Sequence, residues 1–285
     1  MKIHLAKSAG FCFGVKKAIT TALETAKTKE PVFMLGDIVH NEEVARQIQE
    51  TGIKKINRLS SGKGKTLLIR AHGCSEHTLK QALKLGYRII DATCPMVKEI
   101  HKIARELENQ GYRIIILGDK RHDEVMGIVG QLKSKAMVID KLQNIPLEKI
   151  KKITKAGIVV QSTQDLNNLP AILELLRKYI PEISFHNTIC NPTRMKQNEV
   201  KTMPLENSVM IIIGSKTSAN TKRIFQISKS LNKNSYWVNS AKEIKKSWLG
   251  NAKSVGITAG ASTPESSIKE VISKIKIICS SSPYL

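Results

Sequence analysis

Residues 88–118, RIIDATCPMVKEIHKIARELENQGYRIIILG, decide the fold of this chain because they hold a complete strand–helix–strand unit. The run Arg88–Ile90 predicts a strand, and Cys94 follows it closely. Apolar residues at helical spacing then predict an amphipathic helix: Met96, Ile100, Ile103 and Leu107. A second apolar run, Ile114–Leu117, predicts another strand and ends in Gly118. A helix between two such strands is typical of a parallel sheet with a right-handed crossover.

The same plan occurs twice more along the chain. The runs Ile3–Ala6 and Ile183–Phe185 lead to Cys12 and Cys190, and a helix-like stretch follows each. The apolar residues of the first of these helices are Val15, Ala18, Ile19, Ala22 and Leu23. The third helix has only a partial stripe: Met195, Val200 and Met203. A glycine after the next strand lies 24 residues beyond the cysteine in all three units, at 36, 118 and 214. Three equal spacings indicate a tandem duplication.

A third block completes each unit with a strand that ends in small polar residues. The blocks are Leu67–Gly73, Ile158–Thr163 and Val255–Ser262. Ligands gather at the carboxyl ends of parallel strands, so polar loops and cysteines are expected to point toward one centre. We therefore predict an α/β fold of three similar lobes in a pseudo-threefold (trefoil) arrangement. The expected lobes span residues 14–93, 94–188 and 189–285, and residues 1–13 are free to join the third.

Composition restricts the classes of protein that fit. The chain has 285 residues, 41% of them hydrophobic, and a formal net charge of +22. No apolar run is long enough for a bilayer and no signal region precedes the first strand, so we expect a cytoplasmic protein without a membrane partner. Aromatic residues are only 4% and no recognition motif is present, which speaks against nucleic acid as a partner. The charge is consistent with a solvated surface, an anionic small substrate or an acidic electron-transfer protein.

Five scattered cysteines do not suit a disulfide framework, so reduced thiols are expected. Three thiolates are able to bind zinc or an iron–sulfur cluster, and the short Cys-x-x-Cys pairs common in zinc sites are absent. The expected place of Cys12, Cys94 and Cys190 at helix N-termini favours an anionic cluster. The alternative, a buried small hydrophobic residue, fits better for Cys74 and Cys279, which lie outside the repeat.

Several histidines occur at the expected loop ends. His40 and His122 each lie four residues after a repeat glycine, and His72 lies in a third block. Imidazoles together with helix N-termini suit an anion such as diphosphate. In the third unit, residues 214–220 and Ser262 offer hydroxyl and amide donors. Glu124 is the carboxylate expected at the centre, where it would act as a proton donor.

These motifs together resemble the 4-hydroxy-3-methylbut-2-enyl diphosphate reductase family. The segments that carry the resemblance run in family order from residue 10 to residue 262: Gly10–Val15, Val39–Asn41, Ala71–Gly73, Asp91–Pro95, His122–Val125, Gln161–Thr163, Ile189–Cys190, Gly214–Lys216, Ser218–Asn220 and Thr258–Ser262.

The resemblance implies one [4Fe–4S] cluster per chain at the centre of the three lobes, held by Cys12, Cys94 and Cys190, with the fourth iron open to the substrate hydroxyl. It implies that Glu124 delivers protons. It also implies a pocket for the substrate: His40, His72, His122, Ser162, Thr163, Ser218, Ala219, Asn220 and Ser262. The implied reaction uses two electrons and two protons and yields isopentenyl and dimethylallyl diphosphate, the last step of the methylerythritol phosphate route.

Two positions depart from the family pattern. Asp123 stands where proline is usual, beside the expected proton donor, and Ser162 replaces a threonine but keeps the hydroxyl. The expected electron donor is an acidic ferredoxin or flavodoxin. The alternatives are a basic nucleic-acid-binding protein with a structural metal, or a hydrolase or lyase that needs no donor. Equal spacing of the cysteines and glycines favours the reductase, since nucleic-acid binding does not require it.

Overall fold

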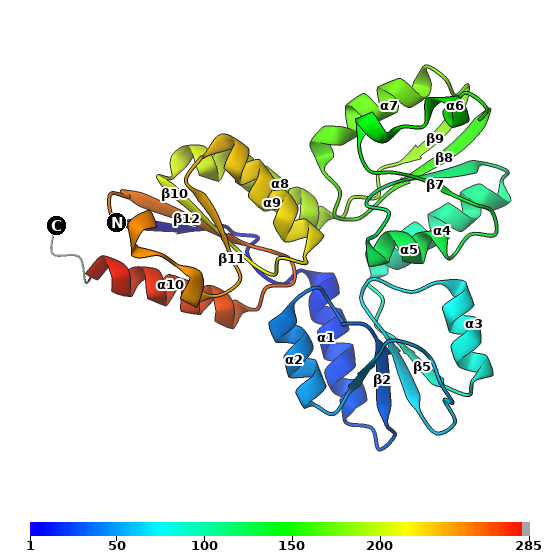
Figure 1. Cartoon of the computed structure of the whole chain (residues 1–285), viewed down its shortest axis with the longest axis horizontal. Coiled ribbons are helices and arrows are strands. Elements are labelled where there is room, and N and C mark those ends of the chain that lie inside the picture. The colour runs from blue at the N-terminus through cyan, green and yellow to red at the C-terminus, as the bar shows by residue number, and fades with distance from the viewer. Residues whose placement is uncertain (281–285) are drawn as a thin grey trace. The chain divides into compact units, whose positions relative to one another are not determined.

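The computed structural model describes residues 1–280 and contains three four-stranded parallel sheets (Figure 1). The first lobe has the strand order β3-β2-β4-β5. Its strands are β2 (Val32–Leu35), β3 (Lys54–Ile56), β4 (Thr66–Ile69) and β5 (Arg88–Asp91). Its helices are α1 (Phe13–Ala26), α2 (Glu42–Glu50) and α3 (Glu76–Lys84).

The second lobe has the order β7-β6-β8-β9. Its strands are β6 (Arg113–Leu117), β7 (Met137–Ile139), β8 (Lys155–Val160) and β9 (Glu182–His186). Its helices are α4 (Pro95–Asn109), α5 (Asp123–Val129), α6 (Leu147–Ile150) and α7 (Leu169–Arg177), with 3₁₀ turns η1 (Leu142–Asn144) and η2 (Leu166–Asn168).

The third lobe has the order β11-β10-β12-β1, so the strand at the start of the chain completes its sheet. Its strands are β1 (Lys2–Leu5), β10 (Val209–Ile213), β11 (Ser235–Val238) and β12 (Ser254–Ala259). Its helices are α8 (Asn191–Glu206), α9 (Ala219–Leu231) and α10 (Glu265–Ser280), with 3₁₀ turns η3 (Ala241–Glu243) and η4 (Lys246–Trp248). The strand order is therefore the same in all three sheets, which confirms the predicted repeat of α/β lobes.

The chain forms two compact units. Unit 1 comprises Met1–Lys16, His40–Arg46 and the chain from Asn191 onward, and it contains the third sheet. Unit 2 comprises Lys17–Val39 and Gln47–Cys190, and it contains the first and second sheets. The limits of these two units do not coincide with those of the three sequence repeats. The lobe limits 14–93, 94–188 and 189–285 therefore stay a prediction.

The central strands of the sheets are buried on both faces because successive residues are apolar and their side chains point to opposite faces. In β10, Met210 and Ile212 pack with Val200 of α8 and Ile224 of α9. Residues on the other face of this sheet pack with α10: Val209, Ile211, Ile213, Val255 and Ile257 contact the cluster of Ile268, Val271 and Ile275. Figure 1 shows α8 and α9 on one side of the sheet and α10 on the other. Such two-sided burial is typical of parallel sheets.

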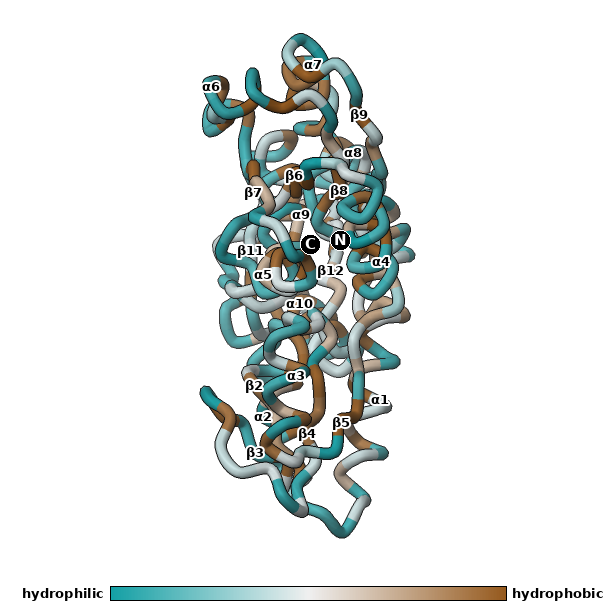
Figure 2. Tube along the Cα trace, turned by 90° about the vertical axis from the view of Figure 1, so that its right-hand side faces the viewer, coloured by the Kyte–Doolittle hydropathy of each residue, from teal (hydrophilic) through white to brown (hydrophobic). Residues whose placement is uncertain are grey.

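The second lobe repeats this arrangement. Ile114 and Ile116 of β6 face α4 and α5, whereas Ile115 and Leu117 join a core that includes Ile172 of α7. Figure 2 shows the contrast along the chain, with hydrophobic residues in strands such as β6 and hydrophilic residues in the connecting loops. Among the described residues, no helix has both the length and the apolar character needed to cross a membrane.

The repeat glycines hold equivalent backbone positions. The N–H of Gly36, Gly118 and Gly214 donates to the carbonyl of the last residue of β3, β7 and β11, at N–O distances of 3.3, 2.9 and 2.9 Å. Gly214 has φ of +146°, where a side chain is strained, and an added Cβ would lie 2.8 Å from the Thr221 and Thr263 hydroxyls. The equal spacing in sequence therefore reflects one local structure built three times.

The predicted apolar stripe of α8 is confirmed at Val200 and Met203, which pack with β10, and is wrong at Met195. Met195 is 56% exposed, whereas Thr193, Lys196 and Gln197 are buried. The buried face includes Lys196 because its ammonium group donates to backbone carbonyls. Hydrophobic periodicity does not detect such a face.

Candidate active site

The three repeat cysteines share one backbone position. Each follows the outer strand of its sheet (β1, β5 or β9) and directly precedes a helix (α1, α4 or α8). The N–H of Cys12, Cys94 and Cys190 donates to the carbonyl of Ala261, Ala71 and Ser162, at 3.1, 3.0 and 3.1 Å. Each acceptor is the second residue after β12, β4 or β8. None of the three forms a disulfide, and all three are partly exposed.

Cys12 also shows how a helix start favours a sulfur anion. The backbone N–H of Val15, in the first turn of α1, donates to Sγ of Cys12 at 3.5 Å. Such N–H groups have no partner inside the helix and stabilise negative charge. Cys94 lies at the corresponding N-cap position of α4.

The two cysteines outside the repeat pack into hydrophobic cores. Cys74 contacts the core of the first lobe and Cys279 that of the third. Burial raises the pKa of the Cys74 thiol to about 11, so this sulfur stays protonated and is a poor metal ligand.

Glu124 is the buried acid of unit 2, with only 2% of its surface exposed. It lies in the first turn of α5 and accepts two hydrogen bonds from Ser162, from the backbone N–H at 2.6 Å and from Oγ at 2.7 Å. Burial raises the pKa of Glu124 above its ordinary value, although both hydrogen bonds oppose the shift. The carboxyl group therefore holds its proton at higher pH than an exposed glutamate does.

Ser162 connects this acid to a cysteine. Its carbonyl accepts the N–H of Cys190, while its own N–H and hydroxyl bind Glu124. The expected second hydroxyl, that of Thr163, accepts instead from Nε2 of Gln161 at 3.0 Å. Oε1 of Gln161 accepts from the N–H of Asp119 at 2.9 Å, so Gln161 fixes the loop after β6 to the loop after β8.

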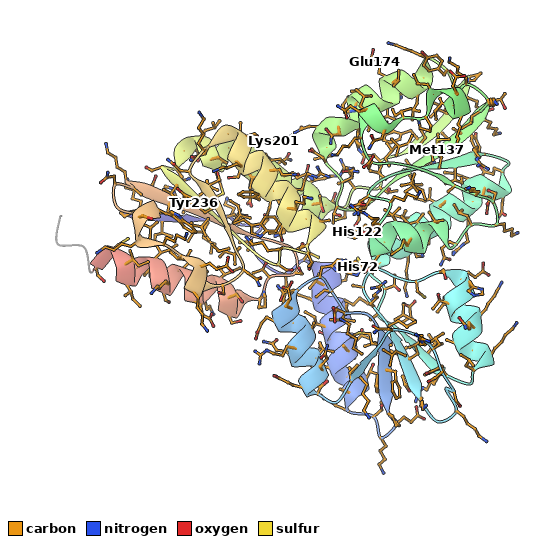
Figure 3. All side chains as sticks on the ribbon, viewed as in Figure 1. His72, His122, Met137, Glu174, Lys201 and Tyr236 are labelled. Atoms are coloured by element: carbon orange, nitrogen blue, oxygen red, sulfur yellow. The ribbon has the colours of Figure 1, made fainter. Side chains whose placement is uncertain are left out.

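His122 is the N-cap of α5, a role that the sequence analysis missed. Its Nδ1 accepts the N–H of Glu124 at 3.2 Å, which requires a deprotonated Nδ1 and leaves Nε2 to carry the hydrogen. The His72 ring lies 5.7 Å from the His122 ring, edge to face, and Figure 3 shows both side chains where the first and second lobes meet in unit 2. Two of the predicted anion-binding histidines are therefore adjacent.

Asp123 is ion-paired. Its Oδ2 lies 2.7 Å from Nη1 of Arg70, and both side chains are about four-fifths buried, with 19% and 22% exposed. Arg70 comes from the loop after β4, so the pair connects the first lobe to the start of α5. The sequence analysis missed Arg70 because nothing in the repeat marks it. The carboxylate of Asp123, beside Glu124, is thus paired with the guanidinium group of Arg70.

The remaining predicted residues lie in unit 1. Ser218 caps α9, where its Oγ accepts the N–H of Thr221 at 3.2 Å, and Ala219 opens the helix. Asn220 is buried, and within the described residues neither its Nδ2 nor its Oδ1 has a hydrogen-bond partner. Ser262 Oγ donates to the backbone carbonyl of His40 at 3.0 Å. A buried, unpaired amide is costly unless a ligand satisfies it.

Three parallel sheets with polar groups at the carboxyl ends of their strands, among them a buried acid, define an α/β enzyme. A family model described as LytB protein matches residues 3–276. The chain belongs to the LytB family.

Curated relatives share almost the whole chain. The 4-hydroxy-3-methylbut-2-enyl diphosphate reductase of Aquifex aeolicus is 38% identical over 97% of this chain and 96% of its own length. The protein of the same name from Campylobacter hominis is 41% identical over 98% of this chain and 100% of its own. Members of the family are thus named as oxidoreductases.

Solved structures agree. A structure of (E)-4-hydroxy-3-methyl-but-2-enyl diphosphate reductase, described as the terminal enzyme of the non-mevalonate pathway, is 38% identical with a TM-score of 0.72, over 97% of this chain and 100% of that chain. The reductase from Plasmodium falciparum is 26% identical with a TM-score of 0.87, over 95% and 87%. The comparisons favour the reductase hypothesis over the nucleic-acid-binding alternative.

Glu124→Gln should remove a pH dependence of stability. Because the pKa of Glu124 is raised from 4.5 in the fold, the native state keeps this proton after the unfolded chain has lost it. Glu124 therefore contributes its whole stabilisation at pH values below its pKa in the unfolded chain. This contribution is lost as pH rises through its pKa in the folded protein. Glutamine has no proton to lose, so the variant should gain stability relative to wild type as pH rises.

Urea unfolding of both proteins between about pH 4 and 8 measures this difference. Glu174→Gln, at an exposed carboxylate on α7 (Figure 3), is the control and should show no comparable trend. A pH-independent difference for Glu124→Gln would contradict the raised pKa.

Proposed function

We propose that this chain is a 4-hydroxy-3-methylbut-2-enyl diphosphate reductase. It removes the substrate hydroxyl as water and releases isopentenyl and dimethylallyl diphosphate, the last step of the methylerythritol phosphate route. The observation that carries the proposal is the equivalent backbone position of Cys12, Cys94 and Cys190 in a chain of this family. The direct experiment is anaerobic turnover of the allylic diphosphate with a chemical reductant, followed by product analysis. No product under these conditions would refute it.

The chain's residues fit one [4Fe–4S] cluster. Three cysteines that form no disulfide each lie at a helix start, where backbone N–H groups favour thiolate. Three protein ligands leave one iron of a cubane without a thiolate. When bound, the cluster supplies electrons and a Lewis-acidic iron for the substrate oxygen. Thiols of this kind stay reduced in the cytoplasm, where we place the reaction.

Glu124 is the proposed proton donor. Its raised pKa keeps the acid form populated to higher pH than in an exposed glutamate, and its protonated oxygen is able to donate to Ser162 Oγ at the observed 2.7 Å. The Ser162 hydroxyl then offers its own hydrogen to the departing oxygen. The Thr163 hydroxyl accepts from Nε2 of Gln161 and is proposed to contact the substrate.

The substrate diphosphate is proposed to bind His40, His72, His122, Ser218, Ala219, Asn220 and Ser262. The α9 start supplies unpaired N–H groups beside the Ser218 cap, and the Asn220 amide supplies a buried donor without another partner in the described chain. His122 donates through Nε2, because Nδ1 caps α5. These donors match the acceptor oxygens of a diphosphate.

The cysteines should fall into two classes. Cys94→Ser should lose most of its cluster iron because it removes a thiolate, whereas Cys74→Ser should retain most, since that thiol packs in a core. Iron analysis and visible absorption of anaerobically purified proteins give the measurement. Full iron retention in Cys94→Ser would refute the ligand assignment.

The two neighbouring carboxylates should differ in catalysis. Glu124→Gln should lower turnover by about 10²–10⁴-fold, the usual contribution of a general acid, after correction for iron. Asp123→Asn should change turnover only a few-fold, because Arg70 already occupies that carboxylate. The double variant should resemble Glu124→Gln. Near-normal turnover in both Glu124→Gln and the double variant would exclude a carboxylate donor here.

The net charge of +22 motivates an acidic ferredoxin or flavodoxin as the physiological donor. Donor-dependent turnover should then fall steeply with added salt, because exposed charges are screened over about 8–10 Å near physiological ionic strength. A neutral chemical reductant is the control and should show no such fall. Equal salt dependence with both reductants would reject electrostatic docking.

A further inference from the structure

The loop that carries Cys12 differs from the other two cysteine loops. Six residues, 6–11, separate the end of β1 from Cys12, whereas two separate β5 from Cys94 and three separate β9 from Cys190. A longer connection has more conformations to lose when the cysteine is fixed. The Cys12 loop therefore needs contacts that the shorter loops do not.

Lys196 supplies such contacts. It is the sixth residue after Cys190, and the corresponding residues after Cys12 and Cys94 are the buried, apolar Ala18 and Ile100. Lys196 is 1% exposed, although a buried ammonium is costly unless it is fully hydrogen-bonded. Only the α8 helix has a cation at this repeat position.

The partners of Lys196 are backbone carbonyls of unit 1. Its Nζ donates to the carbonyl of Gly10 at 3.1 Å, to that of Ala259 at 3.1 Å, and to that of Ser8. Three carbonyls match the three hydrogens of an ammonium group. Ser8 and Gly10 belong to the Cys12 loop, and Ala259 is the last residue of β12.

These contacts flank the hydrogen bond that positions Cys12. The Cys12 N–H donates to the Ala261 carbonyl. Gly10 lies two residues before Cys12, and Ala259 lies two residues before Ala261. Lys196 thus ties together the two backbone segments whose pairing places the cysteine.

Glu199, one turn further along α8, holds the same loop. Its carboxylate accepts the Ser8 N–H at 3.2 and 3.1 Å and the Ser8 hydroxyl at 2.5 Å. Lys196 and Glu199 are three residues apart and lie on one face of the helix. Together they bind the loop through both carbonyl and N–H groups.

We propose that Lys196, assisted by Glu199, is a positioning residue that fixes the Cys12 loop for cluster binding and places a buried positive charge beside it. This inference rests on the proposed function, since it assumes that Cys12 is a cluster ligand. A buried cation near the ligand loop favours the reduced, more negative cluster, and so raises its reduction potential. Loss of an outer partner of a metal ligand typically weakens metal binding about 10–100-fold.

The test compares anaerobically purified holo-proteins. Lys196→Met keeps the approximate length of the side chain but removes its positive charge and its hydrogen-bond donors. Lys196→Arg keeps the charge and the donors. Lys201→Met removes a charge elsewhere on α8 (Figure 3) and is the matched control. The measurements are the rate of iron release to a chelator and the reduction potential from an optical redox titration.

Lys196→Met should release iron about 10–100-fold faster and have a lower potential, while Lys196→Arg and Lys201→Met remain close to wild type. The proposal is overturned if Lys196→Met releases iron at the wild-type rate and has the wild-type reduction potential. If Lys196→Met fails to fold, Glu199→Gln tests the same proposal. Faster iron release from Glu199→Gln supports the positioning role, and a wild-type rate rejects it. A wild-type protein that binds no cluster would instead overturn the proposed function, which separates the two failures.

Discussion

A single backbone hydrogen bond, from the N–H of a cysteine to a carbonyl two residues beyond the neighbouring strand, is the constraint on which the candidate site depends. It occurs at Cys12, Cys94 and Cys190 with nearly the same length. At Cys94 and Cys190 the bond continues the pairing of the outer strand past the sheet, whereas at Cys12 it closes a longer loop onto the corresponding edge. In each case the cysteine lies at the carboxyl edge of its sheet, directly before the next helix. Side-chain contacts would leave more freedom, because they depend on rotamers as well as on the backbone.

Ser162 connects this backbone hydrogen bond to the buried acid Glu124. The residue that accepts the Cys190 N–H also donates both of its hydrogens to Glu124. Burial raises the pKa of Glu124, because the charged form of a buried carboxyl group is unfavourable, while both hydrogen bonds from Ser162 act in the opposite direction. His122 completes the arrangement by capping the helix on which Glu124 lies. One strand end therefore positions a cysteine and an acid together.

The sequence predicted the lobes well because their signals are local and occur three times. Apolar runs and the equal cysteine–glycine spacing located the strands, and the glycines proved to have equivalent hydrogen bonds. It predicted the buried face of α8 only in part: Val200 and Met203 pack in the core, but Met195 is exposed and the polar residues Lys196 and Gln197 are buried. A lysine whose partners are carbonyls of a distant loop has no signature in periodicity. The Arg70–Asp123 pair was missed for the same reason, as its members lie 53 residues apart.

We propose that three equivalent cysteines hold one cluster with one iron free of protein sulfur. Mössbauer spectroscopy of the anaerobically purified, ⁵⁷Fe-labelled protein, with and without the allylic diphosphate, tests this proposal. We expect one four-iron cluster per chain in which a single iron site differs from the other three and changes when the diphosphate is added. Four equivalent iron sites, or a spectrum unaffected by the diphosphate, would contradict it.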